Sequence, residues 1–276
     1  MIPGLKLGSL PAGDTRRRLL DRLGWLPVNI LQAFSFAVVC LVLIPAALLV
    51  HRLTGNCRIP LWMAHRWWGP IVVGGGLARL RVSGRQYWKP NRPFLVVCNH
   101  QSYFDIPVLY SALPAPIHFL GLDYLADWPG IGSFGRAVGT IYLSRHSSYR
   151  SGKTVGELRD YLLEGKTTVV FPEGTRSPDG RIGPFSPILL AAAIEAGADI
   201  LPAAIDGSHR VMPRGGSFLF RPAVVEVRIG EPIPTAGLHV SDRRELAGRV
   251  RASVCALHEG ETVGVPGCVD YPAMAG

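Results

Sequence analysis

A histidine and an aspartate five positions apart are the residues best suited to do chemistry in this 276-residue chain. His100 directly follows the stretch Phe94–Asn99, which begins with a short continuous apolar run typical of a buried strand. If a turn and the start of a helix follow, Asp105 can hold one nitrogen of the His100 ring and leave the other to take a proton. That is the chemistry of a general base with its orienting carboxylate. Spacing alone also fits a purely structural pair, so both interpretations stay open at this point.

Two further polar segments follow predicted strands. The segment Phe171–Ser177 reads Phe-Pro-Glu-Gly-Thr-Arg-Ser, and its Pro and Gly force an irregular loop. Backbone N–H groups of such a loop, together with Thr175 and Arg176, can grip a phosphate, although a plain polar turn is the alternative. The segment Gly139–Arg145 is a strand ending in Arg, which would add a second cation if it emerges at the same sheet edge. A surface Arg is the simpler interpretation of Arg145 taken alone.

The elements that must position these residues alternate between strands and helices. We expect strands at 94–98, 117–120, 141–143, 167–171, 200–205 and 223–229, and helices at 151–163, 188–196 and 242–258. Such alternation predicts an α/β fold with a mixed, largely buried sheet flanked by helices.

An N-terminal membrane-embedded helical segment is also expected. Residues 23–50 carry no charge and are long enough to cross a bilayer. The run is too long for the apolar part of a signal peptide and lacks a small-residue cleavage site, so we expect it to be retained. A single span and a helix that returns to the same face both remain open. The tryptophans that follow fit either the membrane interface or the underside of the core: Trp62, Trp67 and Trp68.

Charge and cysteine content narrow the classes of partner. The net charge is +9, and no acidic residue lies between Asp21 and Asp105. Anionic lipid and nucleic acid both suit such a stretch, but the neighbouring Trp and aliphatic residues favour lipid, and no nucleic-acid recognition motif is present. The five cysteines form no C-x-x-C pair, so we expect reduced thiols and no zinc site.

Three parts are predicted along the chain. Residues 1–76 form a basic leader, the membrane helix and an interfacial segment, which ends at a hinge over Gly74–Gly76. Residues 77–260 form the catalytic domain, and residues 261–276 form a loose tail.

Four motifs in order resemble the glycerolipid acyltransferase family, whose best-known members are 1-acylglycerol-3-phosphate acyltransferases. The matching segments are His100–Asp105 for the H-x-x-x-x-D motif, Gly139–Arg145 for the second, Phe171–Ser177 for the third and Leu201–Ile205 for the fourth. The match to the third motif, FPEGTRS, is the most specific of the four.

The resemblance implies an enzyme that moves a fatty acyl chain from acyl-CoA or acyl-carrier protein to the sn-2 hydroxyl of lysophosphatidate, giving phosphatidate in phospholipid synthesis. It implies that His100 is the general base, that Asp105 orients it, and that no acyl-enzyme forms. The predicted substrate-binding residues are Asn99, Arg145, Glu173, Gly174, Thr175, Arg176 and Pro202. No metal or other cofactor is expected, since the acyl donor is a co-substrate. We expect a cytoplasmic-membrane protein with its catalytic domain in the cytosol.

One departure from the family pattern concerns the acceptor. Members often carry Gly-Pro-Phe-Lys-Lys-Gly after the third motif, whereas this chain has Ser186 and Pro187 at the lysine positions. Either Arg181 supplies the missing positive charge, or the acceptor is another lysolipid such as a lyso-ornithine lipid. A transacylase and an inactive lipid-binding membrane protein are the remaining alternatives.

Overall fold

A mixed sheet forms the centre of the molecule. The computed structural model describes residues 12–114, 116–122, 126–127, 130–143, 152–213 and 221–260. The strands are β1 (Ala78–Ser83), β2 (Phe94–Cys98), β3 (His118–Leu122), β4 (Ile141–Leu143), β5 (Thr168–Val170), β6 (Asp199–Asp206) and β7 (Ala223–Ile229). The α-helices are α1 (Ala12–Thr54), α2 (Arg58–Met63), α3 (Gly69–Gly75), α4 (Asp105–Ala112), α6 (Ile131–Ala137), α7 (Gly152–Leu163), α8 (Leu190–Ala196), α9 (Ser208–Val211) and α10 (Arg243–Glu259). Shorter turns are η1 (Ala64–Trp68), which is π-helical, and the 3-10 turns η2 (Arg85–Tyr87) and η3 (Val240–Asp242).

The strand order brings the predicted motifs to one edge. The seven described strands run in the order β1-β7-β6-β2-β5-β3-β4. Only β6 and β7 pair antiparallel, and the other neighbours are parallel, so the expectation of a mixed sheet is confirmed. Since β6, β2 and β5 are parallel neighbours, the segments that follow their carboxyl ends meet at the same edge of the sheet.

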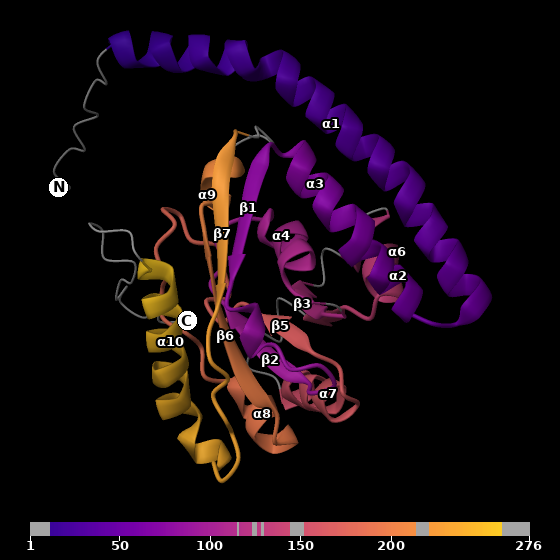
Figure 1. The fold of residues 1–276 in the computed structure, drawn as a ribbon, viewed down its shortest axis with the longest axis vertical. Coiled ribbons are helices and arrows are strands. Elements are labelled where there is room, and N and C mark those ends of the chain that lie inside the picture. Colours follow the sequence, from indigo (N-terminus) through magenta and orange to yellow (C-terminus); the bar gives the residue numbers. More distant parts are fainter. Residues whose placement is uncertain are drawn as a thin grey trace, which may run out of the picture.

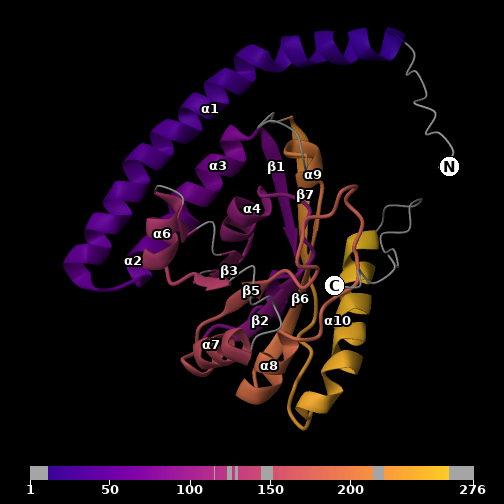
Figure 2. The same ribbon diagram turned by 180° about the vertical axis from the view of Figure 1, so that it is seen from behind.

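Helices cover both faces of the sheet, which explains why β2 is apolar at every position. Phe94, Val96 and Cys98 belong to the core cluster under α3 and α4. Leu95 and Val97 belong to the second cluster, under α7, α8 and α10. Figures 1 and 2 show α3 and α4 on one side of the strands and α8 and α10 on the other. Burying a large apolar side chain fully contributes roughly 1.5–3 kcal/mol, so two covered faces stabilise this sheet strongly.

Glycines let α3 lie directly against α4. A Cβ at Gly69 would meet the Pro107 carbonyl oxygen at 3.0 Å, and one at Gly76 would meet the Phe104 ring at 2.7 Å. The hinge expected at Gly74–Gly76 stays a prediction: two of its glycines end α3 and the third is packed on Phe104.

Helix α1 arches over the outside of the molecule (Figures 1 and 2). Its residues 29–54 form the single helical segment, within the described chain, that is long and apolar enough to cross a membrane, and only 6% of its most apolar window is buried. Gln32 is an exception, because it is buried and its side-chain Nε2 donates to the Gly75 carbonyl oxygen of α3 at 2.5 Å. Beyond α1, Trp62 and Trp67 are exposed, whereas Trp68 packs against the core.

Three details differ from expectation. Strand β1 and helix α6 are present although neither was expected. Helix α10 begins at Arg243, one residue after the expected start at Asp242, and the Asp242 side chain accepts the His239 N–H at 2.8 Å and so caps η3 rather than α10. Cys40, Cys57 and Cys98 are free thiols, whereas Cys255 is disulfide-bonded, which corrects the expectation of fully reduced cysteines. The expected loose tail, residues 261–276, lies outside the described residues.

Candidate active site

The predicted His–Asp pair meets at the carboxyl end of β2. His100 follows β2 by two residues, and Asp105 is the first residue of α4. The His100 Nδ1 and Asp105 Oδ2 atoms lie 2.8 Å apart, which is a hydrogen-bond distance. The Asp105 side chain is fully buried, whereas 15% of the His100 side chain is exposed. No described residue hydrogen-bonds the second ring nitrogen, Nε2, so this nitrogen is available to a substrate.

Several contacts fix the orientation of this pair. Asp105 Oδ2 also accepts backbone N–H bonds from Gln101 at 2.8 Å and from Ser102 at 3.0 Å. The His100 ring stacks on the Phe171 ring, with centroids 4.1 Å apart and planes 16° apart. The imidazole is therefore held at Nδ1 and on one face, which fixes the direction of the edge that carries Nε2.

Glu173 joins the first and third motifs through backbone groups. Its Oε1 accepts the His100 N–H at 2.9 Å, and its Oε2 accepts the Gly183 N–H at 3.0 Å. The third motif also contacts the first directly, because the Ser177 N–H donates to the His100 carbonyl oxygen at 2.7 Å. Burial raises the pKa of Glu173 to about 6, although the two backbone bonds and His100 favour its charged form. Both carboxylate oxygens hold the protein's own backbone, so Glu173 positions the loop around His100.

The middle of the third motif presents a more open surface. Gly174 and Thr175 are exposed, and Gly174 adopts a φ of 68° in a turn closed by its N–H bond to the Phe171 carbonyl. The Arg176 guanidinium lies 3.7 Å from the centroid of the Tyr103 ring, which is itself 41% exposed. An exposed loop with a cation at the same edge as His100 is suited to an anionic group.

The other predicted substrate-binding residues have different positions. Asn99 is 1% exposed, and its amide donates to the Ile205 carbonyl at 2.9 Å and accepts the Ile205 N–H at 2.8 Å. Its side chain therefore links the ends of β2 and β6. Pro202 is buried inside β6 opposite Val97. Arg145 lies outside the described residues.

Comparison with known proteins places the chain in a family. Residues 79–206 match the Acyltransferase family. The chain is 32% identical over 221 residues to the lyso-ornithine lipid O-acyltransferase of Pseudomonas aeruginosa, and the match covers 74% of this chain and 82% of that protein. The chain belongs to the acyltransferase family. This acyltransferase is also 30% identical over 210 residues to the 1-acyl-sn-glycerol-3-phosphate acyltransferase alpha of Mus musculus, covering 72% of this chain and 71% of that one.

A solved structure agrees with the family and the fold. The crystal structure of the 1-acyl-sn-glycerophosphate (LPA) acyltransferase PlsC from Thermotoga maritima is similar with a TM-score of 0.70 and 28% identity. The match covers 82% of this acyltransferase and 92% of that chain. The predicted family and the predicted α/β fold are therefore confirmed.

Sequence reasoning missed three residues at the acyltransferase site. Phe171 supports the His100 ring, Tyr103 lies under Arg176, and the buried Gln101 donates its backbone N–H to Asp105. Each lies within or beside a motif that was singled out, yet a sequence gives no sign of which neighbours a side chain faces. A Gln three residues after the end of a buried strand was the clearest signal available, because a buried amide requires partners.

Proposed function

We propose that this acyltransferase moves a fatty acyl chain from a thioester donor to the free hydroxyl of a lysolipid, with lysophosphatidate as acceptor and phosphatidate as product. The observation that carries the proposal is the 2.8 Å contact between His100 Nδ1 and Asp105 Oδ2, with Nε2 left on the exposed side. The names of the relatives add support, because two of those described above act on 1-acylglycerol-3-phosphate.

In the proposed reaction, His100 Nε2 takes the proton of the acceptor hydroxyl as its oxygen attacks the thioester carbonyl. The C–S bond then breaks, an ester is formed, and the proton passes from His100 to the departing thiolate. Asp105 holds the Nδ1–H and stabilises the imidazolium that forms between the two steps. General-base catalysis of this kind typically contributes ~10²–10⁴-fold.

The acceptor's phosphate fits the exposed part of the third motif. Arg176 supplies charge, and Thr175, in the exposed part of the loop, supplies a backbone N–H and a hydroxyl. From the sequence, Arg145 adds a second cation. The proposed reaction uses no metal or redox cofactor, because proton transfer and anion binding are both supplied by side chains. The acyl donor, acyl-CoA or acyl-carrier protein, is a co-substrate.

Helix α1 supports a membrane location. Its apolar residues 29–54 are exposed on the protein, and both the acceptor and the product are lipids. We place the protein in the cytoplasmic membrane with its catalytic domain in the cytosol, where acyl-CoA and acyl-carrier protein are found.

A second acceptor is favoured by two specific observations. The relative from Pseudomonas aeruginosa is named for lyso-ornithine lipid, which carries no phosphate. The chain also has Ser186 and Pro187 where the family often has lysines, which weakens a phosphate site. A lyso-ornithine lipid is therefore the alternative substrate.

The test supplies purified protein in detergent with oleoyl-CoA and either lysophosphatidate or lyso-ornithine lipid, and measures the acylated product by mass spectrometry. His100→Ala is compared with His239→Ala, a control on an exposed histidine at the start of η3. We expect phosphatidate from the wild type and the control, with a loss of ~10²–10⁴-fold in His100→Ala.

The two acceptors give distinct outcomes. Product from lyso-ornithine lipid alone keeps the mechanism and changes the substrate. Absence of product from either acceptor, with acyl-CoA and with acyl-carrier protein, contradicts the proposed function.

A further inference from the structure

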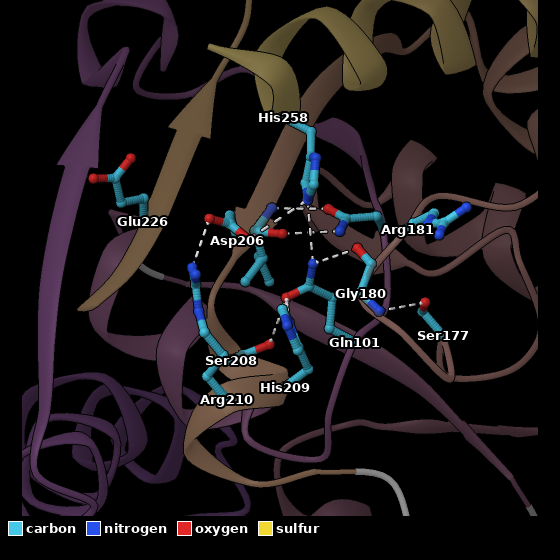
Figure 3. Close-up of polar contacts among 12 residues, drawn as sticks. Gln101, Ser177, Gly180, Arg181, Asp206, Ser208, His209, Arg210, Glu226 and His258 are labelled. Atoms are coloured by element: carbon cyan, nitrogen blue, oxygen red, sulfur yellow. Dashed lines mark hydrogen bonds and ion pairs between the residues drawn. The ribbon is translucent and has the colours of Figure 1, made fainter. Parts of the chain in front are cut away.

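A second polar cluster has no part in the mechanism above (Figure 3). Its centre is Gln101, the residue after His100, whose side chain is fully buried. The backbone N–H of Gln101 is one of the donors to Asp105 Oδ2, at 2.8 Å. Any shift of Gln101 therefore moves a hydrogen bond that holds the orienting carboxylate.

The Gln101 amide is bound by three separate segments. Its Nε2 donates to the Gly180 carbonyl oxygen at 2.7 Å and lies 3.2 Å from His258 Nε2, near the end of α10. Its Oε1 lies 3.0 Å from His209 Nδ1 and 3.3 Å from Ser208 Oγ, at the start of α9. The amide thus ties the loop after the third motif, α9 and α10 to the end of β2.

These contacts fix the protons on both imidazoles. The Gly180 carbonyl can only accept, so the amide nitrogen of Gln101 must face it, and the same nitrogen then faces His258. His258 Nε2 must therefore accept and carry no proton. His209 must donate from Nδ1, because it faces the amide oxygen. Burial lowers the pKa of both histidines, which favours their neutral forms.

Charged groups surround the two rings. Asp206 of β6 lies nearest, with its Oδ1 3.8 Å from His258 Nε2, and it also binds Arg210 at 2.8 Å. The groups that interact electrostatically with one ring or the other are Asp105, Asp179, Asp206, Arg210, Arg228 and Glu259. Among them the acids favour protonation of the rings and the arginines oppose it.

The loop after the third motif depends on the same cluster. Gly180 has a φ of 87°, and a Cβ there would lie 2.7 Å from the His209 ring. Its N–H donates to Ser177 Oγ at 2.9 Å, and Ser177 N–H binds the His100 carbonyl. The loop is therefore attached to the catalytic strand end both directly and through Gln101.

We propose that Gln101 is a positioning residue for His100, and that His258 of α10 must accept a hydrogen bond from its amide for the catalytic pair to be aligned. The inference rests on the proposed function of His100 as a base. Protonation of His258 places an N–H against the amide N–H of Gln101 and breaks this contact, although Asp206 partly compensates. Because the pKa of His258 lies below its usual value, the contact is intact at neutral pH and is lost as the pH falls below that lowered value.

The test compares two substitutions of one residue. His258→Leu removes the acceptor, whereas His258→Gln keeps an acceptor oxygen and cannot titrate. Gln101→Met removes the amide with little change in shape, and Ser253→Ala on the exposed side of α10 is the control. Turnover is measured against pH with the active acceptor, and hydrogen–deuterium exchange is measured for residues 101–105 and 177–183.

We expect His258→Leu and Gln101→Met to lower kcat by about tenfold to a hundredfold, with KM changed by less than about threefold, because misplacing a base affects the reaction more than binding. Both should speed exchange in the two segments. His258→Gln should keep kcat within about threefold of the wild type and lose activity less steeply towards acid pH.

Two results would overturn the inference: wild-type kcat and exchange in His258→Leu, or an equal loss in His258→Gln and His258→Leu. If the wild type turns over neither acceptor, the proposed function fails by itself. Hydrogen–deuterium exchange still tests the inference in that case, because unchanged protection of residues 101–105 in His258→Leu contradicts the inference.

Discussion

At the scale of single residues, the site is held together by side chains that bind backbone groups. Asp105 Oδ2 accepts two backbone N–H bonds in addition to His100 Nδ1. Glu173 places one oxygen on the His100 N–H and the other on the Gly183 N–H. Such contacts make the position of His100 depend on the ends of strands rather than on flexible side-chain pairs, which is how a rigid site is built.

Glu173 gives a prediction for stability against pH. Its pKa is raised by burial from 4.5 to about 6, so the folded protein binds this proton more tightly than the unfolded chain. The stability that this group contributes is present below about pH 4.5 and is lost as the pH rises through about 6. The glutamine of Glu173→Gln cannot titrate. The Tm of the variant minus the Tm of the wild type should therefore rise as the pH increases from about 4.5 to about 6. Thermal unfolding in detergent measures the Tm of the variant and of the wild type at each pH.

The comparison is made as a difference because burial also lowers the pKa of His209 and of His258, so these two rings add a pH dependence of their own. Their contribution is shared by wild type and variant and cancels in the difference. An identical Tm difference at about pH 4.5 and about pH 7 would show that Glu173 has an ordinary pKa.

At the scale of elements, the strands that carry the motifs could be predicted and the elements around them could not. The strands β2, β5 and β6 are buried on both faces, and their continuous apolar runs are visible in the sequence. Strand β1 alternates Arg79 and Arg81 with half-buried residues at the edge of the sheet, which is a weak pattern over six residues. Helix α3 is rich in glycine and is stabilised by its packing on α4. Local helix propensity does not predict such a helix.

The contacts of the candidate site also divide into those that the sequence predicts and those that it does not. The His100–Asp105 contact follows from a spacing of five residues across a turn and a helix start. The role of Asn99 as a link to Ile205, and the burial of Gln101 between α9 and α10, depend on residues more than a hundred positions away. Such partners are set by the sheet order and cannot be seen in one sequence.

The loop that ends at Gly183 gives a prediction at this scale. Gly180 and Gly165 have similar left-handed conformations, with φ of 87° and 79°. A Cβ at Gly180 would strike the His209 ring at 2.7 Å, whereas one at Gly165 would meet nothing within 4 Å. Each Ala substitution should cost roughly 1–2 kcal/mol of folding free energy for the strained backbone. Only Gly180→Ala should also lower kcat, by about tenfold or more, because it displaces the loop tied to His100.

Unfolding and turnover are measured on the same two preparations. Gly165→Ala controls for the folding free energy lost to the strained backbone, since it has the same strain without the clash with the His209 ring. Equal kcat values in the two variants would mean that the loop tolerates displacement, and that its contacts with His209 and Gln101 do not align the base.

At the scale of the whole molecule, the exposed apolar helix α1 and the sheet edge that carries His100 are both suited to a lipid substrate, since a lipid acceptor has to leave and re-enter a bilayer unless the enzyme sits on it. The segment 58–75, which follows α1, joins the two parts. Leu61, Val72 and Val73 within it belong to the same core cluster as Phe104, the residue before Asp105. The segment that follows α1 is thus packed against the element that carries Asp105.

A charge in the middle of α1 tests the membrane role of this helix. Leu41 is 73% exposed and lies near the centre of the apolar residues 29–54, whereas Leu53 is 75% exposed and lies at their end beside His51 and Arg52. A Lys at the centre of a membrane helix costs about 2.5–3.5 kcal/mol, but a Lys at its end reaches the interface. Leu41→Lys should therefore release a larger share of the protein from membranes under alkaline carbonate extraction, and Leu53→Lys should stay bound like the wild type. The two substitutions add the same charge and remove the same side chain at similar exposure, so equal release would mean that α1 does not enter the bilayer core.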